Sequence, residues 1–175
     1  MTTSVQILRA EVEHLPAIAA LAAVIWRRHY PRIISHGQIE FMLERMYSLD
    51  TLRAEISSKG IQFYRLLVEE RFAGFASIGP TDAPDTVKLH KLYLLPELHG
   101  KGFGSMLLKH CEAEARQLGA RRMVLAVNKR NAQAIAAYQR NGFAIEESVA
   151  VDIGGGFVMD DFNMGKNLAN AGGAC

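Results

Sequence analysis

The sequence predicts an α/β (α+β) fold, in which helices cover both faces of a mixed, mostly antiparallel sheet. Strand and helix patterns follow one another in the order β, helices, three strands, α, β, α and two strands. Short turns join two pairs of successive strands, which indicates antiparallel hairpins. The strand–loop–helix–strand segment at 87–127 has the form of a crossover, which would place a central pair of strands in parallel.

The first sixty residues are expected to be mainly helical. Val5–Ala10 alternates weakly between apolar and polar residues and predicts a first strand. Apolar residues then recur at helical spacing over Glu11–His29, and Pro31 ends that helix because its ring cannot continue it. Ser35 and Ser48 stand where their side chains would cap two further helices.

The remaining chain predicts six strands and two helices. Runs rich in aliphatic and aromatic residues indicate the strands, while Gly119 and the pair Asn141-Gly142 mark the ends of the helices. The expected strands cover 61–68, 72–78, 87–95, 123–127, 143–151 and 157–164, and the expected helices end at 118 and 140.

Composition places the chain among ordinary globular proteins, with 175 residues of which 49% are hydrophobic and 22% charged. We expect one domain over 1–166 and a tail of small residues over 167–175. The net charge of +2 gives no support for a nucleic-acid partner. No apolar run approaches the ~20 residues of a membrane span, and the N-terminus lacks the features of a signal peptide, so a cytoplasmic protein is expected.

The cysteines and histidines suggest neither a disulfide nor a metal site. Cys111 shares a helical face with leucine and alanine residues and is expected to be a buried free thiol, whereas Cys175 falls in the tail. The six histidines are scattered, without an HxxxH or HxH pair. We therefore expect no bound metal.

A glycine-rich loop, HGKGFG at His99–Gly104, joins a strand to a helix. Successive backbone amides of such a loop, together with the positive end of the helix dipole, form a cradle for an anion such as phosphate. The P-loop pattern is absent because Gly102 follows Lys101 where Ser or Thr is required. The position after four strands and the Gly-x-Gly-x-Gly spacing also argue against a dinucleotide fold. A glycine-rich turn that binds nothing is the alternative.

Two segments resemble the signatures of the GNAT superfamily of N-acyltransferases. The run LYLLPELHGKGFGSMLL is similar to its acetyl-CoA loop, [QR]xxGx[GA], with His99 in the Gln/Arg place and Gly102 and Gly104 in the others. The run VNKRNAQAIAAYQRNGF is similar to its second signature, an Asn seven residues before a Tyr. The resemblance covers Ile61 to Met164, and two motifs in the expected strand–helix context are more specific than one.

The resemblance implies a site for acetyl-CoA, with no metal. The backbone of Leu92, Tyr93 and Leu94 would pair with the pantetheine arm. A bulge near Leu94–Pro96 would splay this strand from 123–127, so that the arm lies in the gap. Asn131 would contact the cofactor and Tyr138 would lie near its sulfur. His99 would belong to the cofactor site, and the backbone amides expected to hold the pyrophosphate are those of Gly100, Lys101, Gly102, Phe103, Gly104 and Ser105.

Acetyl transfer to an amine requires a base, a donor for the oxyanion and an acid for the departing thiolate. Tyr138 suits the acid, although its helical spacing is also explained by core packing. The oxyanion donor implied by the resemblance is a backbone N–H freed by the bulge, that of Leu94. By strand alternation His90 shares a face with Leu92 and Leu94, and its ordinary pKa suits a base. A partly buried structural histidine and water-relayed deprotonation are the alternatives.

Substrate contacts in such folds would come from the first helices and the last hairpin. Trp26 and Tyr30 are the candidates from the helices. Either Asp160 or Asp161 could attract an ammonium group, because adjacent strand residues face opposite sides. We expect Asp160 to be the anchor. The segment GGGFVMDDFNM is most similar to small-amine or polyamine acetyltransferases.

The sequence therefore predicts an enzyme, an N-acetyltransferase that moves an acetyl group from acetyl-CoA to a primary amine of a small molecule. Direct transfer in a ternary complex is expected, because no nucleophilic Cys or Ser lies near the motifs. A protein or peptide N-terminal acetyltransferase and a non-catalytic acyl-CoA-binding module are the alternatives. A homodimer is possible, since many such folds dimerise.

Overall fold

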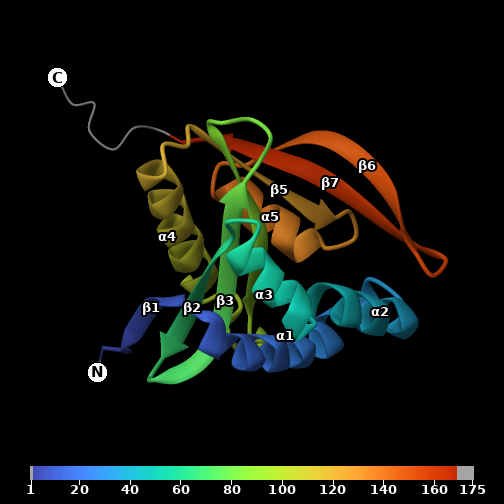
Figure 1. Cartoon of the computed structure of the whole chain (residues 1–175), viewed down its shortest axis with the longest axis horizontal. Coiled ribbons are helices and arrows are strands. Elements are labelled where there is room, and N and C mark those ends of the chain that lie inside the picture. Colours follow the sequence, from blue (N-terminus) through green and yellow to red (C-terminus); the bar gives the residue numbers. More distant parts are fainter. Residues whose placement is uncertain (1, 169–175) are drawn as a thin grey trace.

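The computed structural model describes residues 2–168, which form one seven-stranded sheet in the order β1-β2-β3-β4-β5-β7-β6 (Figure 1). All neighbouring strands are antiparallel except β4 and β5, which confirms the expected mixed sheet with a central parallel pair. The strands are β1 (Val5–Ala10), β2 (Gln62–Val68), β3 (Arg71–Pro80), β4 (Thr86–Leu94), β5 (Arg122–Asn128), β6 (Ala144–Gly154) and β7 (Phe157–Asn167).

The helices begin where the sequence provides caps. Ser35 Oγ accepts the backbone N–H of Gln38 at 3.1 Å, and Ser48 Oγ accepts that of Thr51 at 3.2 Å, as expected. The expected first helix divides in two, because Pro16 lacks an N–H and the α-helix starts just before it. The helices are α1 (Leu15–His29), α2 (His36–Tyr47), α3 (Leu49–Ser57), α4 (Phe103–Gln117) and α5 (Ala132–Arg140), with 3-10 turns η1 (Val12–His14), η2 (Tyr30–Arg32) and η3 (Pro96–Leu98).

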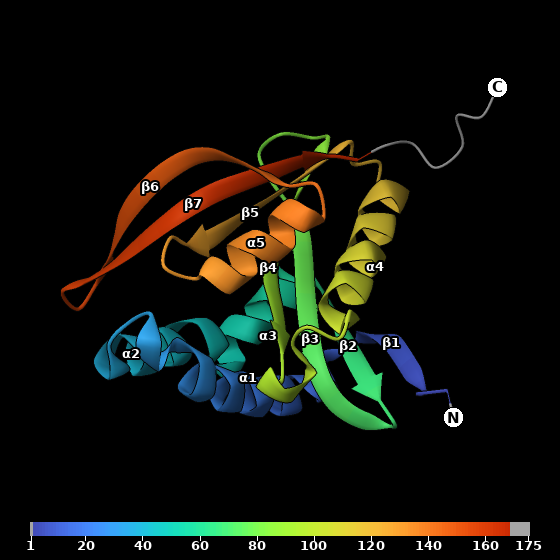
Figure 2. The ribbon, with the colours of Figure 1, turned by 180° about the vertical axis from the view of Figure 1, so that it is seen from behind.

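Helices pack on both faces of the sheet, as predicted. α1, α2 and α3 cover one face and share a core with Phe63 and Phe75 of the strands. α4 and α5 cover the other face, which Figure 2 presents from behind, and Cys111 lies fully buried there as a free thiol. Apolar residues on both sides of the central strands therefore hold three layers together.

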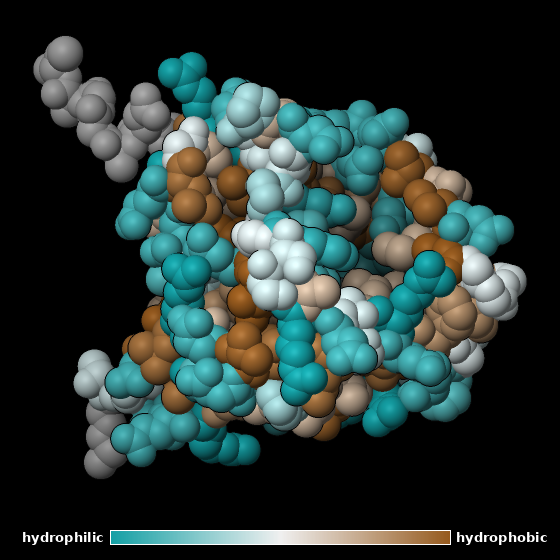
Figure 3. Space-filling model, viewed as in Figure 1, coloured by the Kyte–Doolittle hydropathy of each residue, from teal (hydrophilic) through white to brown (hydrophobic). Residues whose placement is uncertain are grey.

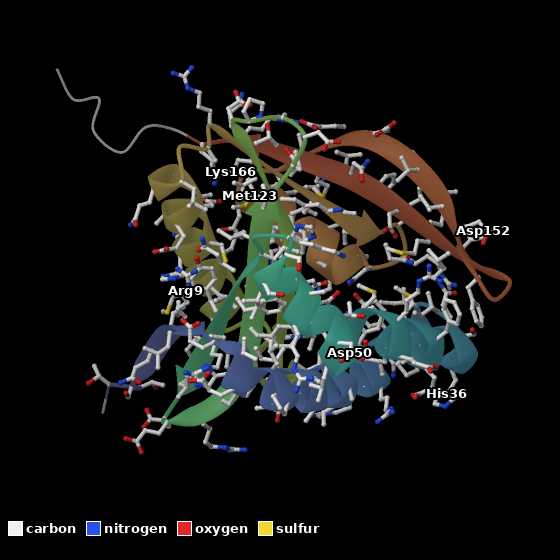
Figure 4. All side chains as sticks on the ribbon, viewed as in Figure 1. Arg9, His36, Asp50, Met123, Asp152 and Lys166 are labelled. Atoms are coloured by element: carbon white, nitrogen blue, oxygen red, sulfur yellow. The ribbon has the colours of Figure 1, made fainter. Side chains whose placement is uncertain are left out.

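The β6–β7 hairpin crosses to the α1–α3 layer, and its turn lies beside α2 (Figure 1). Gln38 of α2 donates to the carbonyl of Val158 at 2.9 Å, and Arg45 donates to that of Ile153 at 2.8 Å. The rings of Phe41 and Phe157 lie 5.2 Å apart. Figure 4 shows Asp152 near this turn. These contacts join the last strands to the second helix.

The sheet extends further toward the C-terminus than the expected boundary at residue 166. Lys166 is paired with Met123 of β5, close to it in Figure 4, and β7 continues through Asn167. Leu168 is buried in the core beside α4. The rest of the expected tail, including Cys175, lies outside the described residues.

The bulge of β4 lies at His90, not near Leu94–Pro96 as expected. The β3–β4 register passes from Ile78 opposite Leu89 to Ser77 opposite Lys91, which leaves His90 as the extra residue. Pro96 needs no bulge because β4 has ended and η3 begins there. The parallel pairing of β4 with β5 stops at Leu89, so the two strands separate beyond that point.

None of the helices in the described part of the chain is long and apolar enough to cross a membrane.

Candidate active site

A cavity of about 570 Å³ runs through the gap between β4 and β5 and reaches both helix layers. Figure 3 shows the molecule hollowed between α2 and the β6–β7 hairpin. We call its two parts the α2–α3 half and the glycine-loop half. The first is lined by residues such as Gln38, Met42, Met46, Glu55, Lys88, His90, Lys91, Met159 and Asp161; the second by Gly100, Gly102, Gly104, Ser105, Asn131, Ala134, Ala137 and Tyr138.

The glycine loop has the backbone expected of an anion cradle. Gly100 and Gly102 have φ of 74° and 86°, a conformation that L side chains rarely adopt. Gly104 lets the helix approach β4, because an added Cβ would lie 3.2 Å from a methyl carbon of Leu94. Gly102 is the N-cap of α4 and provides no side-chain cap. The first-turn amides of α4 can therefore bind an anion at the positive end of the helix.

His99 ties this loop to the rest of the cavity. Its Nε2 lies 3.1 Å from the carbonyl oxygen of Leu94, and its Nδ1 lies 3.3 Å from the amide nitrogen of Gln133. The His29 ring packs edge-on against His99 with centroids 5.7 Å apart. A histidine in the Gln/Arg place of the motif thus holds the loop against both β4 and α5.

The backbone of β4 beyond the bulge presents hydrogen-bonding groups to the gap. Leu95 N–H bonds the carbonyl of Ala73 on the β3 side at 2.9 Å. Strand alternation therefore turns the N–H and C=O of Leu94 and Leu92 the other way, toward β5, with which they no longer pair. An extended ligand in the gap could pair with these groups.

Two of the expected loop residues do not line the cavity. The side chains of Lys101 and Phe103 are absent from the cavity lining, and Phe103 packs against the core beside α4. Ser105 does line the cavity, and its hydroxyl accepts a 3.0 Å hydrogen bond from Asn141. An anion in the cradle would therefore be held mainly by main-chain amides.

Asn131 and Tyr138 mark the two ends of the inner face of α5. The buried Asn131 side chain caps the helix by accepting the N–H of Ala134 at 3.4 Å, and its oxygen lies 3.4 Å from His29 Nε2. Tyr138 packs edge-on against Phe143 at 5.7 Å and also lines the cavity. Burial raises the pKa of Tyr138, so its phenol keeps its proton at neutral pH.

Trp26 and Tyr30 lie where the two halves of the cavity meet. Their rings stack at 4.4 Å, and Tyr93 of β4 lies 5.6 Å from Trp26. Burial raises the pKa of both Tyr30 and Tyr93, whose hydroxyls interact. Trp26 Nε1 is buried and has no hydrogen-bond partner among the described residues. The wall here is aromatic and carries donors for a polar ligand.

The structure places the expected anchor Asp160 outside the cavity lining, whereas its neighbour Asp161 is part of that lining. Asp160 is exposed and forms an ion pair with Lys129, because its side chain points away from the α2–α3 half. Asp161 is 6% exposed and lines the cavity, and no donor in residues 2–168 bonds its carboxylate. Burial and the neighbouring Asp160 raise the pKa of Asp161, while Lys88 and Lys129 act in the opposite direction.

His90 lines the same half, but its surroundings weaken it as a base. As the bulged residue it leaves the alternation that was expected to align it with Leu92 and Leu94. Its ring lies against Gly79, and its Nε2 is buried without a partner among the described residues. Burial, with Lys88, Lys91 and Lys59 nearby, lowers the pKa of His90 to about 4. It therefore takes up a proton poorly at neutral pH.

Two lysines of β4 differ in their pairing. Lys91 is 4% exposed, and its ammonium bonds both carboxylate oxygens of Glu55 at 2.9 Å. Lys88 lines the cavity near Asp161 and makes no ion pair within residues 2–168. Sequence reasoning missed Glu55, Lys88 and Lys91; strand alternation alone could have suggested Lys88. The described residues contain no group of three or more His, Cys, Asp or Glu that could hold a metal ion.

Comparison with known proteins identifies the class. Residues 24–143 match the family described as "Acetyltransferase (GNAT) family", and the chain belongs to this family. It is 27% identical over 161 residues to a spermidine N(1)-acetyltransferase of Thermoplasma acidophilum, covering 90% of this chain and 96% of the relative. It is 30% identical over 108 residues to an L-methionine sulfoximine/L-methionine sulfone acetyltransferase of Salmonella typhimurium, covering 58% and 63% respectively.

Solved structures agree with the fold. The PaiA N-acetyltransferase of Thermoplasma acidophilum, solved in complex with coenzyme A, superposes with a TM-score of 0.78 and 26% identity, over 94% of this chain and 99% of that one. A GCN5-related N-acetyltransferase from Rhodopseudomonas palustris gives 0.79 at 21% identity, over 96% and 99%. The protein is therefore a GNAT-family acetyltransferase.

Proposed function

We propose that this enzyme transfers the acetyl group of acetyl-CoA directly to the primary amine of a small molecule. The observation that carries the proposal is the cavity itself, which joins an anion cradle on one face of the sheet to an unpaired carboxylate on the other. Each substrate would enter its own half, and the reacting atoms would meet in the gap between β4 and β5.

The glycine-loop half fits coenzyme A. The amides of Gly100–Ser105 would hold the pyrophosphate, since left-handed glycines and an uncapped helix end leave them free. The backbone of Leu92 and Leu94 would pair with the pantetheine arm, and Asn131 borders the same path. Bound there, acetyl-CoA would supply an activated thioester carbonyl.

The reaction is a single displacement. The neutral amine nitrogen attacks the thioester carbonyl carbon, a C–N bond forms and the C–S bond breaks. One amine proton passes to a base in the α2–α3 half, and the departing thiolate takes a proton from the Tyr138 hydroxyl. The backbone N–H groups of Leu92 and Leu94 are the donors available to the oxyanion in the gap.

Asp161 suits the base better than His90. The unpaired carboxylate can first hold the ammonium form of the acceptor and then accept its proton, and its raised pKa favours that transfer. The driving force for transfer of the amine proton to His90 is small, because its pKa is near 4 and its Nε2 is enclosed.

The contact between the β6–β7 turn and α2 supports a small acceptor over a protein. Two hydrogen bonds, from Gln38 and Arg45, hold the hairpin over the α2–α3 half. An extended peptide would have to displace them, whereas a small amine would fit inside the closed wall.

The test has two parts. Calorimetry should show acetyl-CoA binding, and a thiol-release assay should show turnover with members of a panel of amino acids, polyamines, aminoglycosides and short peptides. Absence of acetyl-CoA binding would refute the proposal. Binding without turnover on any amine would favour a non-catalytic acyl-CoA-binding module, and turnover on peptides alone would favour a protein acetyltransferase.

A further inference from the structure

We infer that the acceptor is a zwitterionic amino acid with a medium-sized apolar side chain, whose amine binds Asp161 and whose carboxylate binds Lys88. The inference rests on the proposed function and assigns the substrate class of the same cavity. Its basis is the charge of the α2–α3 half, the position of the two unpaired groups on one face of the sheet and the residues around them.

The charged side chains that line the α2–α3 half carry no net charge together. Glu55 and Lys91 neutralise each other through two 2.9 Å contacts, so neither is available to a ligand without breaking a buried ion pair. Asp161 and Lys88 remain, one of each sign, and both line the cavity. A ligand that satisfies both must carry one positive and one negative group.

Asp161 and Lys88 line the same half of the cavity without pairing with each other. Lys88 acts on the Asp161 carboxylate electrostatically, yet the two form no ion pair within 4.0 Å. They project from β7 and β4 on the same face of the sheet, on either side of β5. A molecule whose ammonium and carboxylate are attached to one carbon could bridge such a pair, with its nitrogen directed at the gap.

A polyamine fits this half less well. A chain with several ammonium groups would require several unpaired carboxylates, but Asp161 is the only one that the lining provides within residues 2–168. Lys88 would also repel the second ammonium group.

The apolar residues that line the α2–α3 half indicate the side chain of the acceptor amino acid. Three methionines, Met42, Met46 and Met159, line this half from α2 and β7. Methionine is unbranched and polarisable, and adapts to apolar groups of different shape. The amino acid would therefore carry an apolar or thioether side chain directed toward α2.

The experiment compares matched acceptors. L-methionine, 3-(methylthio)propylamine, which is the same molecule without its carboxylate, and spermidine are assayed for thiol release with saturating acetyl-CoA. We expect kcat/KM for L-methionine to exceed that of both amines by roughly tenfold or more, the range of one charged hydrogen bond. Equal or higher values for either amine would overturn the inference.

Two variants of Lys88 and one control variant test whether Lys88 is responsible for the preference for L-methionine. Lys88→Gln should raise KM for L-methionine roughly tenfold or more with little change in kcat, and leave the decarboxylated amine unaffected. Lys88→Glu should shift the preference toward spermidine. Lys59→Gln removes the same charge outside the cavity lining and should keep the wild-type ratio. An unchanged ratio in Lys88→Gln would refute the role of Lys88.

The experiments distinguish failure of the proposed acetyl transfer from failure of the amino-acid assignment. If calorimetry detects no acetyl-CoA binding to the wild-type protein, the proposed function fails and this inference with it. If acetyl-CoA binds and spermidine or the decarboxylated amine is acetylated in preference, only the inference fails. Each variant is first checked for a wild-type melting temperature and acetyl-CoA affinity.

Discussion

Tyr138 illustrates how one side chain can both pack and face a reaction site. Its helical spacing and its motif position suggested packing and catalysis respectively, and the ring contacts Phe143 while lining the cavity. At the residue scale, the local motif spacing predicted Asn131 and Tyr138 as site residues, and both line the cavity. The sequence was less informative for Asp160 and Asp161, because choosing between them requires the register of β7 against β5.

Replacing Tyr138 by Phe keeps the ring contact and removes the acid. We expect kcat to fall by about 100-fold while the acetyl-CoA dissociation constant stays near the wild-type value. Steady-state kinetics with a competent acceptor and calorimetry check both. Full turnover in Tyr138→Phe would show that the phenol is not the acid.

The two aspartates of β7 form a natural pair for a test. Asp161→Asn should lower kcat/KM by about 100-fold or more, because the ammonium anchor and the base are lost together. Asp160→Asn removes an equal charge from the exposed neighbour and should change kcat/KM little. If the two variants behave alike, Asp161 has no special role.

The lowered pKa of His90 predicts that the stability of the protein depends on pH. The pKa of His90 falls from an ordinary value of 6.5 to about 4 on folding, so the unfolded chain binds more protons between these two pH values. Stability present above pH 6.5 should therefore be lost as the pH falls through 4, by roughly 1–3 kcal/mol. Urea unfolding from pH 8 to pH 4 should show a shallower decline for His90→Gln. Parallel curves would contradict the buried neutral imidazole.

At the scale of elements, the sequence predicted most of the strands and helices. Local signals were sufficient there: Ser35 and Ser48 as caps, Pro31 as a stop and glycines at turns. The bulge was misplaced because a register shift depends on which residue of β3 lies opposite, and no local signal marks His90. The division at Pro16 was overlooked, although proline near the first helical position is a known start signal.

Gly102 and Gly119 have the same backbone conformation, but only Gly102 belongs to the proposed anion cradle. Both have φ of 86°, and an added Cβ would meet nothing within 4 Å at either position. Alanine should therefore cost each about 1–2 kcal/mol of stability. Only Gly102→Ala, at the start of α4, should also weaken acetyl-CoA binding, as calorimetry can measure. Equal affinities would show that the cradle tolerates a distorted N-cap.

At the scale of the whole molecule, one buried ion pair joins the α1–α3 layer to the sheet. Glu55 of α3 and Lys91 of β4 are both buried, so Glu55→Gln would leave an ammonium group without its counter-charge. We expect a loss of about 3–5 kcal/mol in urea unfolding. The double variant Glu55→Leu, Lys91→Met should recover most of it. A small loss in Glu55→Gln would mean that Lys91 reaches another partner or water.

The interrupted pairing of β4 and β5 has a kinetic consequence. If each substrate occupies its own half, coenzyme A and the acetylated acceptor leave through opposite sides of the sheet. Neither product then obstructs the exit of the other, so the fold imposes no fixed order of release. Two separate exits would let the rate of each departure change independently, through α4 and the glycine loop on one side and α2 and the hairpin on the other.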